Sequence, residues 1–354
     1  MTAANPSPLE RFDFDLPASR IAQQAKRRGF SRLMVLPPGK DAPPVHAVFR
    51  QLPGWLAPGD CMVVNDSRVL PARLWAVKKD TGGSVELLLH REVKPAMWEA
   101  LSRPYRRLKP GTELILGATV ATVQELLGEG KITLSFGSPA LARAAIRQVG
   151  VVPLPPYIRR SFRSPNAEER KDRRRYQTIF ARTEGSVAAP TAGLHFSKPL
   201  VTELRRQGVR VAPVTLHVGW GTFAPLSEQS WQARRLHPET YAISAETAGE
   251  IAECRRRKGR VIACGTTVAR TLESAAGKRG LVKAGEGRTE LFIQPGHRWQ
   301  VVDGLLTNFH LPRSSLLVLV CALAGPERVM AAYAEAVRRE YRFYSYGDAM
   351  LVFR

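Results

Sequence analysis

Three of the seven histidines lie in loops of similar composition, and an imidazole is the side chain best suited to proton transfer near neutral pH. The loops APTAGLHF, TLHVGWGTFAPL and DGLLTNFHLPRSS contain His195, His217 and His310. Each loop mixes small residues, turn-forming residues and uncharged polar groups, which lets backbone N–H groups approach a ligand closely. A buried, hydrogen-bonded structural histidine is the alternative for each of them taken alone.

The segment CGTTVARTLES predicts a strand, a turn at Gly265, Thr266 and Thr267, and then a helix. Such a turn points N–H groups at an anion, either a phosphate or a carboxylate, although threonine here is also a common helix cap. The segment has neither the lysine of a P-loop nor the G-x-G-x-x-G of a dinucleotide-binding fold. No G-x-S-x-G elbow occurs in the chain, so a serine hydrolase is not indicated.

The chain is strongly basic, with 53 Lys and Arg against 31 Asp and Glu and a formal net charge of +22. This charge favours nucleic acid as a partner, and an anionic membrane surface second; an arginine-rich coding bias or solubility alone is the alternative. The stretch 159–175 holds eight basic and three acidic residues. Its arginines predicted to contact RNA phosphates are Arg159, Arg160, Arg173, Arg174 and Arg175.

Cysteine spacing and apolar runs point to a cytoplasmic protein. Cys61, Cys254, Cys264 and Cys321 form no C-x-x-C pair, and no histidine lies at zinc-ligand spacing from them, so we expect neither disulfides nor a metal. The N-terminal residues lack the apolar run of a signal peptide, and the longest apolar run, residues 315–325, is too short to span a bilayer.

The length of 354 residues and a change of texture predict two domains. Between residues 70 and 155, short β-rich runs alternate with Gly, Pro and Lys turns, which is typical of a small antiparallel barrel. On either side, residues 1–69 and 156–354 alternate strands with helices and predict a layered α/β domain. The barrel is therefore expected as an insertion into a discontinuous α/β domain.

Six motifs resemble one family. They are NDSRVLPARL, GSVAAPTAGLHF, TLHVGWGTF, GTTVARTLES, DGLLTNFHLPRSSLLVLVCALAG and YRFYSYGDAML. In order and length they are similar to the S-adenosylmethionine:tRNA ribosyltransferase-isomerase family of queuosine biosynthesis, from about residue 12 to the C-terminus. The resemblance implies a three-layer α/β domain with an inserted β-barrel.

The resemblance also implies an unusual use of S-adenosylmethionine. The family transfers and isomerises its ribosyl moiety onto the aminomethyl group of 7-aminomethyl-7-deazaguanine in the wobble position of tRNA, giving epoxyqueuosine with release of adenine and methionine. S-adenosylmethionine is then the ribosyl donor, no metal is called for, and tRNA is the macromolecular partner of a protein expected to be monomeric. We expect no membrane partner.

The chemistry contains three proton-handling tasks. The sulfonium acidifies the adjacent C5′ hydrogens, the acceptor amine must be neutral to attack, and adenine leaves more easily when a donor reaches its ring. We expect His195, His217 and His310 to perform them, with Asp303 in the catalytic set and Glu239 orienting a histidine or pairing with the sulfonium. The residues expected to bind the substrates are Pro190, Thr191, Gly193, Gly219, Gly221, Thr222, Gly265, Thr266, Thr267, Asn308, Tyr346 and Asp348.

The sequence departs from the family pattern near His237. Arg234 stands where a second histidine is usual, and Leu236 replaces a usual methionine. These changes leave open a family member with an altered acceptor. Two other classes are a non-catalytic RNA-binding paralogue and an ordinary methyltransferase, which would normally show a Gly-rich loop after its first strand.

Overall fold

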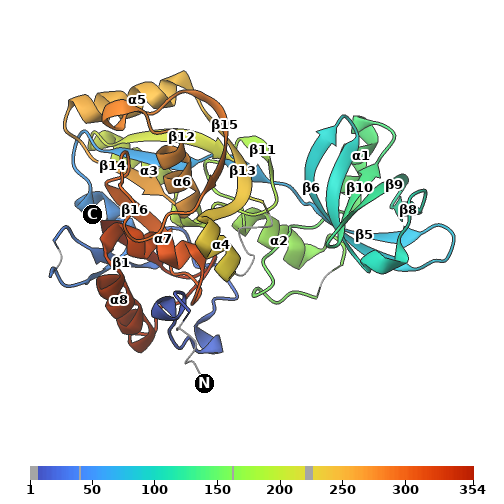
Figure 1. Cartoon of the computed structure of the whole chain (residues 1–354), viewed down its shortest axis with the longest axis horizontal. Helices are drawn as coiled ribbons and strands as arrows, with labels where there is room; N and C mark the ends of the chain where they lie inside the picture. The colour runs from blue at the N-terminus through green and yellow to red at the C-terminus, as the bar shows by residue number, and fades with distance from the viewer. Residues whose placement is uncertain (1–6, 40, 162, 220–225) are drawn as a thin grey trace.

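The chain forms a large α/β domain and a separate closed β-barrel (Figure 1). The structure is a computed structural model that describes residues 7–39, 41–161, 163–219 and 226–354. Two short strands, β4 (Ser67–Val69) and β11 (Thr183–Ser186), pair in parallel where the chain passes between the two parts. The predicted fold class, an α/β domain with an inserted barrel, is confirmed.

A mixed sheet forms the centre of the α/β domain. Its strands in chain order are β1 (Arg32–Leu36), β2 (Val45–Val48), β3 (Cys61–Asn65), β12 (Arg210–Leu216), β13 (Arg235–Ile243), β14 (Val261–Cys264), β15 (Gly285–Leu291), β16 (Gly304–Asn308) and β17 (Ala349–Phe353). In space their order is β15-β13-β12-β3-β14-β16-β17-β1-β2. The neighbours β12, β3, β14 and β16 run parallel, so their carboxyl ends share one edge of the sheet.

Alternation of side chains along the buried strands divides the core into two layers. On β3, Cys61 and Val63 pack into one cluster, and Met62 and Val64 pack into another on the opposite face. The first face is covered by α5 (Ala245–Arg256), α6 (Thr266–Ser274), α7 (Ser315–Ala324) and α8 (Pro326–Arg338). The second is covered by η3 (Phe49–Trp55), η5 (Thr191–His195) and α3 (Lys198–Arg206). Helices on both faces give the three layers.

The barrel closes on itself in the order β10-β7-β6-β5-β8-β9. Its strands are β5 (Arg73–Lys78), β6 (Ser84–Lys94), β7 (Met97–Arg103), β8 (Glu113–Leu116), β9 (Thr119–Gly128) and β10 (Lys131–Ser135), and helix α1 (Pro139–Val149) packs against them. Arg73 and Val151 pair where the chain enters and leaves the barrel. The predicted domain bounds, 70–155 for the barrel and 1–69 with 156–354 for the α/β domain, stay a prediction.

The remaining short elements connect these parts. Helix α2 (Ala167–Arg175) lies between the α/β domain and the barrel (Figure 1). The others are η1 (Glu10–Phe12), η2 (Ala18–Arg20), η4 (Tyr105–Arg107), α4 (Glu228–Ala233) and η7 (Lys278–Gly280). In the described part of the chain, no single helix is long and apolar enough to cross a bilayer, and only α7 and α8 taken together, bent by 118°, meet a test of length and composition.

Serine or asparagine side chains cap most of the long helices. Ser197, Ser244 and Ser314 accept hydrogen bonds from the first turns of α3, α5 and α7. Helices α6 and α8 have no side-chain cap, and α6 is preceded by Gly265 with φ of 101°. A residue with a Cβ is strained at that φ, so glycine lets strand β14 turn directly into the helix.

Candidate active site between the two domains

The predicted loops meet at the carboxyl edge of the parallel strands. β12 ends at Leu216, β14 at Cys264 and β16 at Asn308, so the three loops that follow begin at the same edge. Ligands of open α/β sheets bind outside this edge. The barrel is attached to the same edge, because the chain leaves β3 at Asn65 and enters the barrel through β4.

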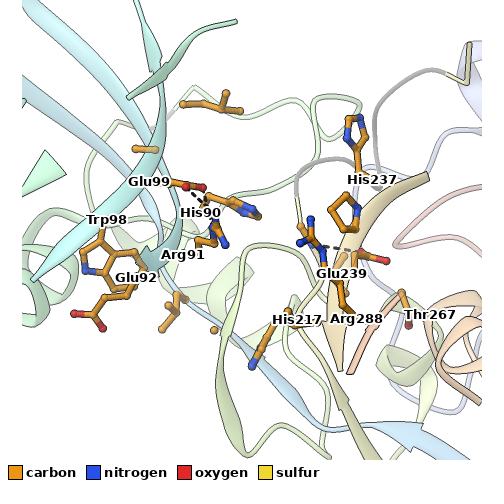
Figure 2. Close-up of a pocket in the computed structure, with 18 of the residues that line it drawn as sticks. His90, Arg91, Glu92, Trp98, Glu99, His217, His237, Glu239, Thr267 and Arg288 are labelled. Atoms are coloured by element: carbon orange, nitrogen blue, oxygen red, sulfur yellow. Dashed lines mark hydrogen bonds and ion pairs between the residues drawn. The ribbon is translucent and has the colours of Figure 1, made fainter. Parts of the chain in front are cut away.

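A cleft of about 930 Å³ lies between the barrel and the α/β domain. Figure 2 shows its two walls: His90 and Glu99 of the barrel lie opposite His217, Glu239 and Thr267 of the α/β domain. Both walls carry imidazoles and charged side chains. The cleft is therefore a polar site to which each domain contributes.

A second cavity of about 530 Å³, here called the inner pocket, lies within the α/β domain. Pro190, Thr191 and Asn308, predicted to bind the substrates, line it with His310, predicted to be catalytic, and with Tyr344. The rings of Tyr157 and Tyr344 stack with centroids 4.4 Å apart and planes 19° apart. The inner pocket thus offers a flat aromatic surface beside a few polar groups.

The N-terminus of α6 is shared by the two cavities. Thr266 and Thr267 line both the cleft and the inner pocket, and Gly265 lines the inner pocket. The predicted strand, turn and helix are therefore present. The first N–H groups of any α-helix have no partner within the helix, so this end can bind an acceptor from either cavity.

Hydrogen bonds to neighbouring strands fix His217 in the cleft. Asn65 donates to the carbonyl of Leu216 at 2.9 Å, and the Ser186 hydroxyl accepts from the N–H of Val218 at 2.9 Å. The His217 ring also lies against Gly185, where an added Cβ would come within 2.7 Å of Cε1. Gly185 is therefore required for the ring to occupy this position.

The electrostatic state of His217 suits a proton acceptor. Burial lowers its pKa, and the charge of Asp66 opposes this in part. Nδ1 is buried and has no hydrogen-bond partner among the described residues. His217 is therefore neutral at pH 7, and one ring nitrogen is not used by the fold.

His90 of β6 was not predicted, and it brings a second imidazole to the cleft. Burial lowers its pKa, with Glu99 opposing, and its Nδ1 has no partner in the described ranges. A Cβ added at Gly219 would lie 3.1 Å from His90 Cε1, so the two domains touch here. Because Leu89 points into the barrel, alternation places His90 outside, but the sequence does not show what it meets there.

A buried ion pair lies in the same cleft. Glu239 pairs with Nη1 of Arg270, and its other oxygen accepts from the N–H of Gly219 at 3.4 Å. Arg270 also donates from Nε to the carbonyl of Leu291 at 2.9 Å. Glu239 was expected at the site, whereas Arg270 on α6 was missed, although it lies within the quoted motif CGTTVARTLES.

His195 lines neither cavity, in contrast to the expectation that it transfers a proton. Its Nδ1 lies 2.9 Å from the Ser31 hydroxyl, its Nε2 lies 3.1 Å from Nδ2 of Asn308, and its ring stacks on Phe49. Burial lowers its pKa to about 4. Both nitrogens are thus used to hold neighbouring side chains.

Asn308 and His310 face the inner pocket. Nδ2 of Asn308 also donates to the carbonyl of Tyr344 at 3.1 Å, which leaves its buried Oδ1 with no partner in the described structure. Nε2 of His310 lies 2.7 Å from the Thr307 hydroxyl, and burial lowers its pKa to about 3. His310 is therefore neutral, and Thr307 occupies one of its nitrogens.

Asp303 lies away from both cavities. It lies at the start of β16, on the opposite edge of the sheet, where it accepts from the N–H of Val261 at 2.8 Å and from Arg255 at 2.7 Å. A residue that precedes a parallel strand lies at the edge opposite the carboxyl ends, so Asp303 has structural contacts here and lines neither cavity.

Three further predicted residues have structural contacts outside both cavities. Asp348 accepts from the N–H groups of Arg32 and Arg342 at 2.8 and 2.9 Å. The Tyr346 hydroxyl donates to Asp172 at 3.3 Å, and a Cβ at Gly193 would lie 2.9 Å from the side chain of Thr178. Gly219 lines the cleft as expected, while Gly221 and Thr222 lie outside the described residues.

Ion pairs occupy part of the predicted RNA-binding stretch. Arg160 binds Asp172 of α2 at 2.6 Å. Arg173 pairs with Glu169 on the same helix at 2.9 Å and donates to the carbonyl of Gly150 at 2.8 Å, so these two arginines hold α2 in place. Arg159 and Arg174 are exposed, and Arg175 is half-buried. The acidic residues of the stretch are thus partners of its arginines.

Other exposed arginines line the cleft itself. Arg143 and Arg147 stand one turn apart on α1, and Arg288 of β15 lies on the α/β wall. Residues four apart share one face of a helix, so the α1 pair presents two guanidinium groups along the cleft. No motif marks these residues in the sequence.

All four cysteines are free and buried. Over the described ranges, no three His, Cys, Asp or Glu side chains come together in a group that could hold a metal ion.

The fold is an α/β sheet with an inserted β-barrel, and the candidate site is a cleft lined by residues of both parts. The sequence model of a family described as "Queuosine biosynthesis protein" matches residues 9–352. The chain belongs to this family, which confirms the family expected from its motifs.

Similar proteins cover nearly the whole chain. "S-adenosylmethionine:tRNA ribosyltransferase-isomerase" of Anaeromyxobacter sp. (strain K) is 51% identical over 98% of this chain and 99% of that protein. The protein of the same name from Pelotomaculum thermopropionicum is 47% identical over 97% and 99%. A crystal structure of S-adenosylmethionine tRNA ribosyltransferase from Thermotoga maritima is 36% identical, covering 97% of this chain and 100% of that one, with a TM-score of 0.55.

Proposed function

We propose that this chain is an S-adenosylmethionine:tRNA ribosyltransferase-isomerase. It transfers and isomerises the ribosyl moiety of S-adenosylmethionine onto the aminomethyl group of 7-aminomethyl-7-deazaguanine in the wobble position of tRNA. The observation that carries the proposal for the site is the meeting of two cavities, one within the α/β domain and one between the domains, at the N-terminus of α6. A two-substrate transfer needs two binding sites that share one reacting point.

The bonds and protons balance. The C5′–S bond and the N-glycosidic bond break, and methionine and adenine leave. A new carbon–carbon bond closes the carbon ring formed from the ribose, and the aminomethyl nitrogen bonds to this ring. C5′ and the amine each lose one proton and adenine takes up one, so one proton is released per turnover. The protein's task is to receive two protons and to deliver one.

The inner pocket fits the adenine of the cosubstrate. Oδ1 of Asn308 is an acceptor without a partner among the described residues, and the 6-amino group of adenine is a donor. The Tyr344 ring and Pro190 offer flat and apolar surfaces to a purine. His310 lies at the same wall, where it can reach the leaving base.

His195 acts on this site through Asn308. A neutral His195 accepts from Nδ2 of Asn308, and this fixes the amide with Oδ1 free. The orientation requires an unprotonated Nε2, which the low pKa of the buried ring provides. We therefore assign His195 as a positioning residue rather than a catalytic one.

The cleft fits the anticodon segment of tRNA. It lies between the domains and is lined by Arg143, Arg147 and Arg288, which we propose as phosphate contacts. Arg159 and Arg174 extend this basic surface, whereas Arg160 and Arg173 keep their roles in holding α2. Because its proposed substrate is tRNA, we propose that the protein is cytoplasmic, and because one chain supplies both walls, we propose a monomer.

His217 is the proposed acceptor of the proton from the acceptor amine. It is neutral, lies in the cleft where the modified base would enter, and keeps a nitrogen without a partner in the described structure. His90 lies on the barrel wall of the same cleft (Figure 2). The second proton acceptor is therefore supplied by the barrel domain, which explains why the cleft needs both domains.

Product identification tests the function. The protein is incubated with S-adenosylmethionine and tRNA carrying 7-aminomethyl-7-deazaguanine, and the small products are separated by chromatography. Adenine and methionine together are expected, whereas S-adenosylhomocysteine indicates methylation, and no product indicates a binding protein. tRNA with unmodified guanine is the control, and its reaction would indicate an altered acceptor, for which Leu236 and His237 in the cleft wall are the variable residues.

A further inference from the structure

The uncapped N-terminus of α6 has a buried guanidinium beside it. Arg270 follows Thr266 by four residues and Thr267 by three, so the three side chains share one face of the helix. Long side chains on a helix lean toward its N-terminus, which directs Arg270 toward the two threonines. All three residues line the cleft.

One nitrogen of Arg270 is left without a partner. The side chain is 6% exposed, its Nη1 pairs with Glu239 and its Nε donates to Leu291, but Nη2 is buried and has no acceptor within the described ranges. A buried charged donor without an acceptor is destabilising, because its desolvation is not compensated. Glu239 balances the charge of the guanidinium, and the helix N-terminus adds about half a positive charge.

We infer that the N-terminus of α6 and Nη2 of Arg270 form a binding site for the carboxylate of the amino-acid part of the cosubstrate. Two or more convergent N–H donors and a net positive potential match one carboxylate. The inference rests on the proposed function, because that function supplies the ligand. A phosphate of the RNA presents similar oxygens and is the competing source of the anion.

The position of this anion site determines how the cosubstrate is oriented across the two cavities. Thr266 and Thr267 face both cavities, whereas Arg270 lines the cleft. With adenine against Asn308 in the inner pocket and the carboxylate at Arg270, the ribose lies between them at the end of α6. The ribose then faces the cleft, from which the acceptor amine approaches.

Calorimetric binding without RNA tests the inference. Wild-type protein is titrated with S-adenosylmethionine and with decarboxylated S-adenosylmethionine, which lacks only the carboxylate. We expect the decarboxylated compound to bind about 10- to 100-fold more weakly, because charge-assisted hydrogen bonds are lost. Arg270→Met should lower the affinity for S-adenosylmethionine by a similar factor and leave the affinity for the decarboxylated compound unchanged. Equal affinities of the two compounds for wild-type protein would overturn the inference.

Two further variants separate binding from folding. Arg270→Met leaves Glu239 buried without its arginine, so the double variant Glu239→Gln/Arg270→Met removes both charges and should show the same loss. Arg255→Met, which breaks a pair with Asp303 at the opposite edge of the sheet, is the matched control and should leave both affinities unchanged.

The remaining outcomes separate this inference from the proposed function. If Arg270→Met weakens the binding of tRNA and not the binding of S-adenosylmethionine, the anion is an RNA phosphate and the inference is wrong. Carboxylate-dependent binding of S-adenosylmethionine without release of adenine and methionine would support the anion site and contradict the proposed function.

Discussion

The cleft and the inner pocket differ in how their histidines are used. In the inner pocket, His310 bonds to Thr307, and Asn308 is held from behind by His195. In the cleft, His90 and His217 each keep a buried ring nitrogen without a partner in the described structure. A side chain fixed by hydrogen bonds suits recognition of a ligand, whereas an imidazole with an unused nitrogen suits transfer of a proton.

The two cavities differ in which domains supply their lining residues, and this explains the difference. The inner pocket is lined by α/β-domain residues, whose segments fix one another through the central sheet. The cleft needs the barrel, and one contact between the domains is made by His90 at Gly219. Recognition and proton transfer are therefore assigned to different cavities, and the predictions below test this assignment.

The largest effect on activity is expected for His217 in the cleft. His217→Ala should lower the rate of single-turnover ribosyl transfer by about two to four orders of magnitude, the usual worth of a proton-transfer group. Its melting temperature should change little, because Nδ1 has no partner among the described residues. His297→Ala, at a histidine that lines neither cavity, is the control. A nearly normal rate per folded molecule would contradict the assignment.

The buried histidines of the α/β domain predict a pH-dependent stability. The pKa of His195 is lowered to about 4 from its value of 6.5 in the unfolded chain, so the unfolded state takes up the proton first as the pH falls. The stabilisation is complete above pH 6.5 and is lost as the pH falls toward 4, by on the order of 3 kcal/mol for this group. Urea denaturation at several pH values measures how the free energy of unfolding depends on pH. His195→Gln should make this dependence less steep. An unchanged dependence would count against a buried, neutral His195.

Steady-state kinetics distinguish positioning from catalysis at His195. His195→Ala frees the Asn308 amide to rotate, so we expect KM for S-adenosylmethionine to rise about tenfold or more while kcat falls less. His195→Gln keeps a polar partner for Asn308 and should restore part of the affinity. A fall in kcat of several orders of magnitude with unchanged KM would return the proton-transfer role to His195.

The RNA contact predicts a smaller effect. Arg143→Gln/Arg147→Gln should weaken tRNA binding about tenfold and reduce the slope of log affinity against log salt by about two. Arg106→Gln/Arg107→Gln, an exposed pair on the barrel that does not line the cleft, should change neither value. Equal losses in the two variants would indicate a non-specific charge effect.

The smallest effect is expected where the cavities join. Thr267→Val removes a hydroxyl at nearly constant volume, while the N–H groups of α6 remain, so S-adenosylmethionine should bind only a few-fold more weakly. Calorimetry measures this directly. An unchanged affinity in a folded protein would restrict Thr267 to the start of the helix.

Much of the fold could be predicted from the sequence because it depends on local patterns. The β-rich texture of the barrel and the strand–helix alternation around it are periodic signals, and both the barrel and the α/β sheet are present. The loops containing His217 and Asn308 were identified because small residues follow buried strands. These loops lie at one edge of the sheet because their strands pair in parallel. The sequence of a single segment does not show which strands pair.

The differences between the predicted and the observed placement of site residues have specific physical causes. Asp303 belongs to a quoted motif, but it lies before its strand, and therefore at the wrong edge of the sheet. The pairing of Arg173 with Glu169 could have been recognised from their i, i+4 spacing. His90 could not, because contact between the barrel and Gly219 depends on domain placement.

The central claim is that the two cavities hold the two substrates of one transfer. A crystal structure with S-adenosylmethionine and an anticodon stem-loop carrying 7-aminomethyl-7-deazaguanine tests it most directly. The account predicts the adenine 6-amino group at about 3 Å from Oδ1 of Asn308, and the acceptor amine in the cleft beside His217. Adenine bound in the cleft with the inner pocket empty, or an acceptor base bound away from His217, would contradict it.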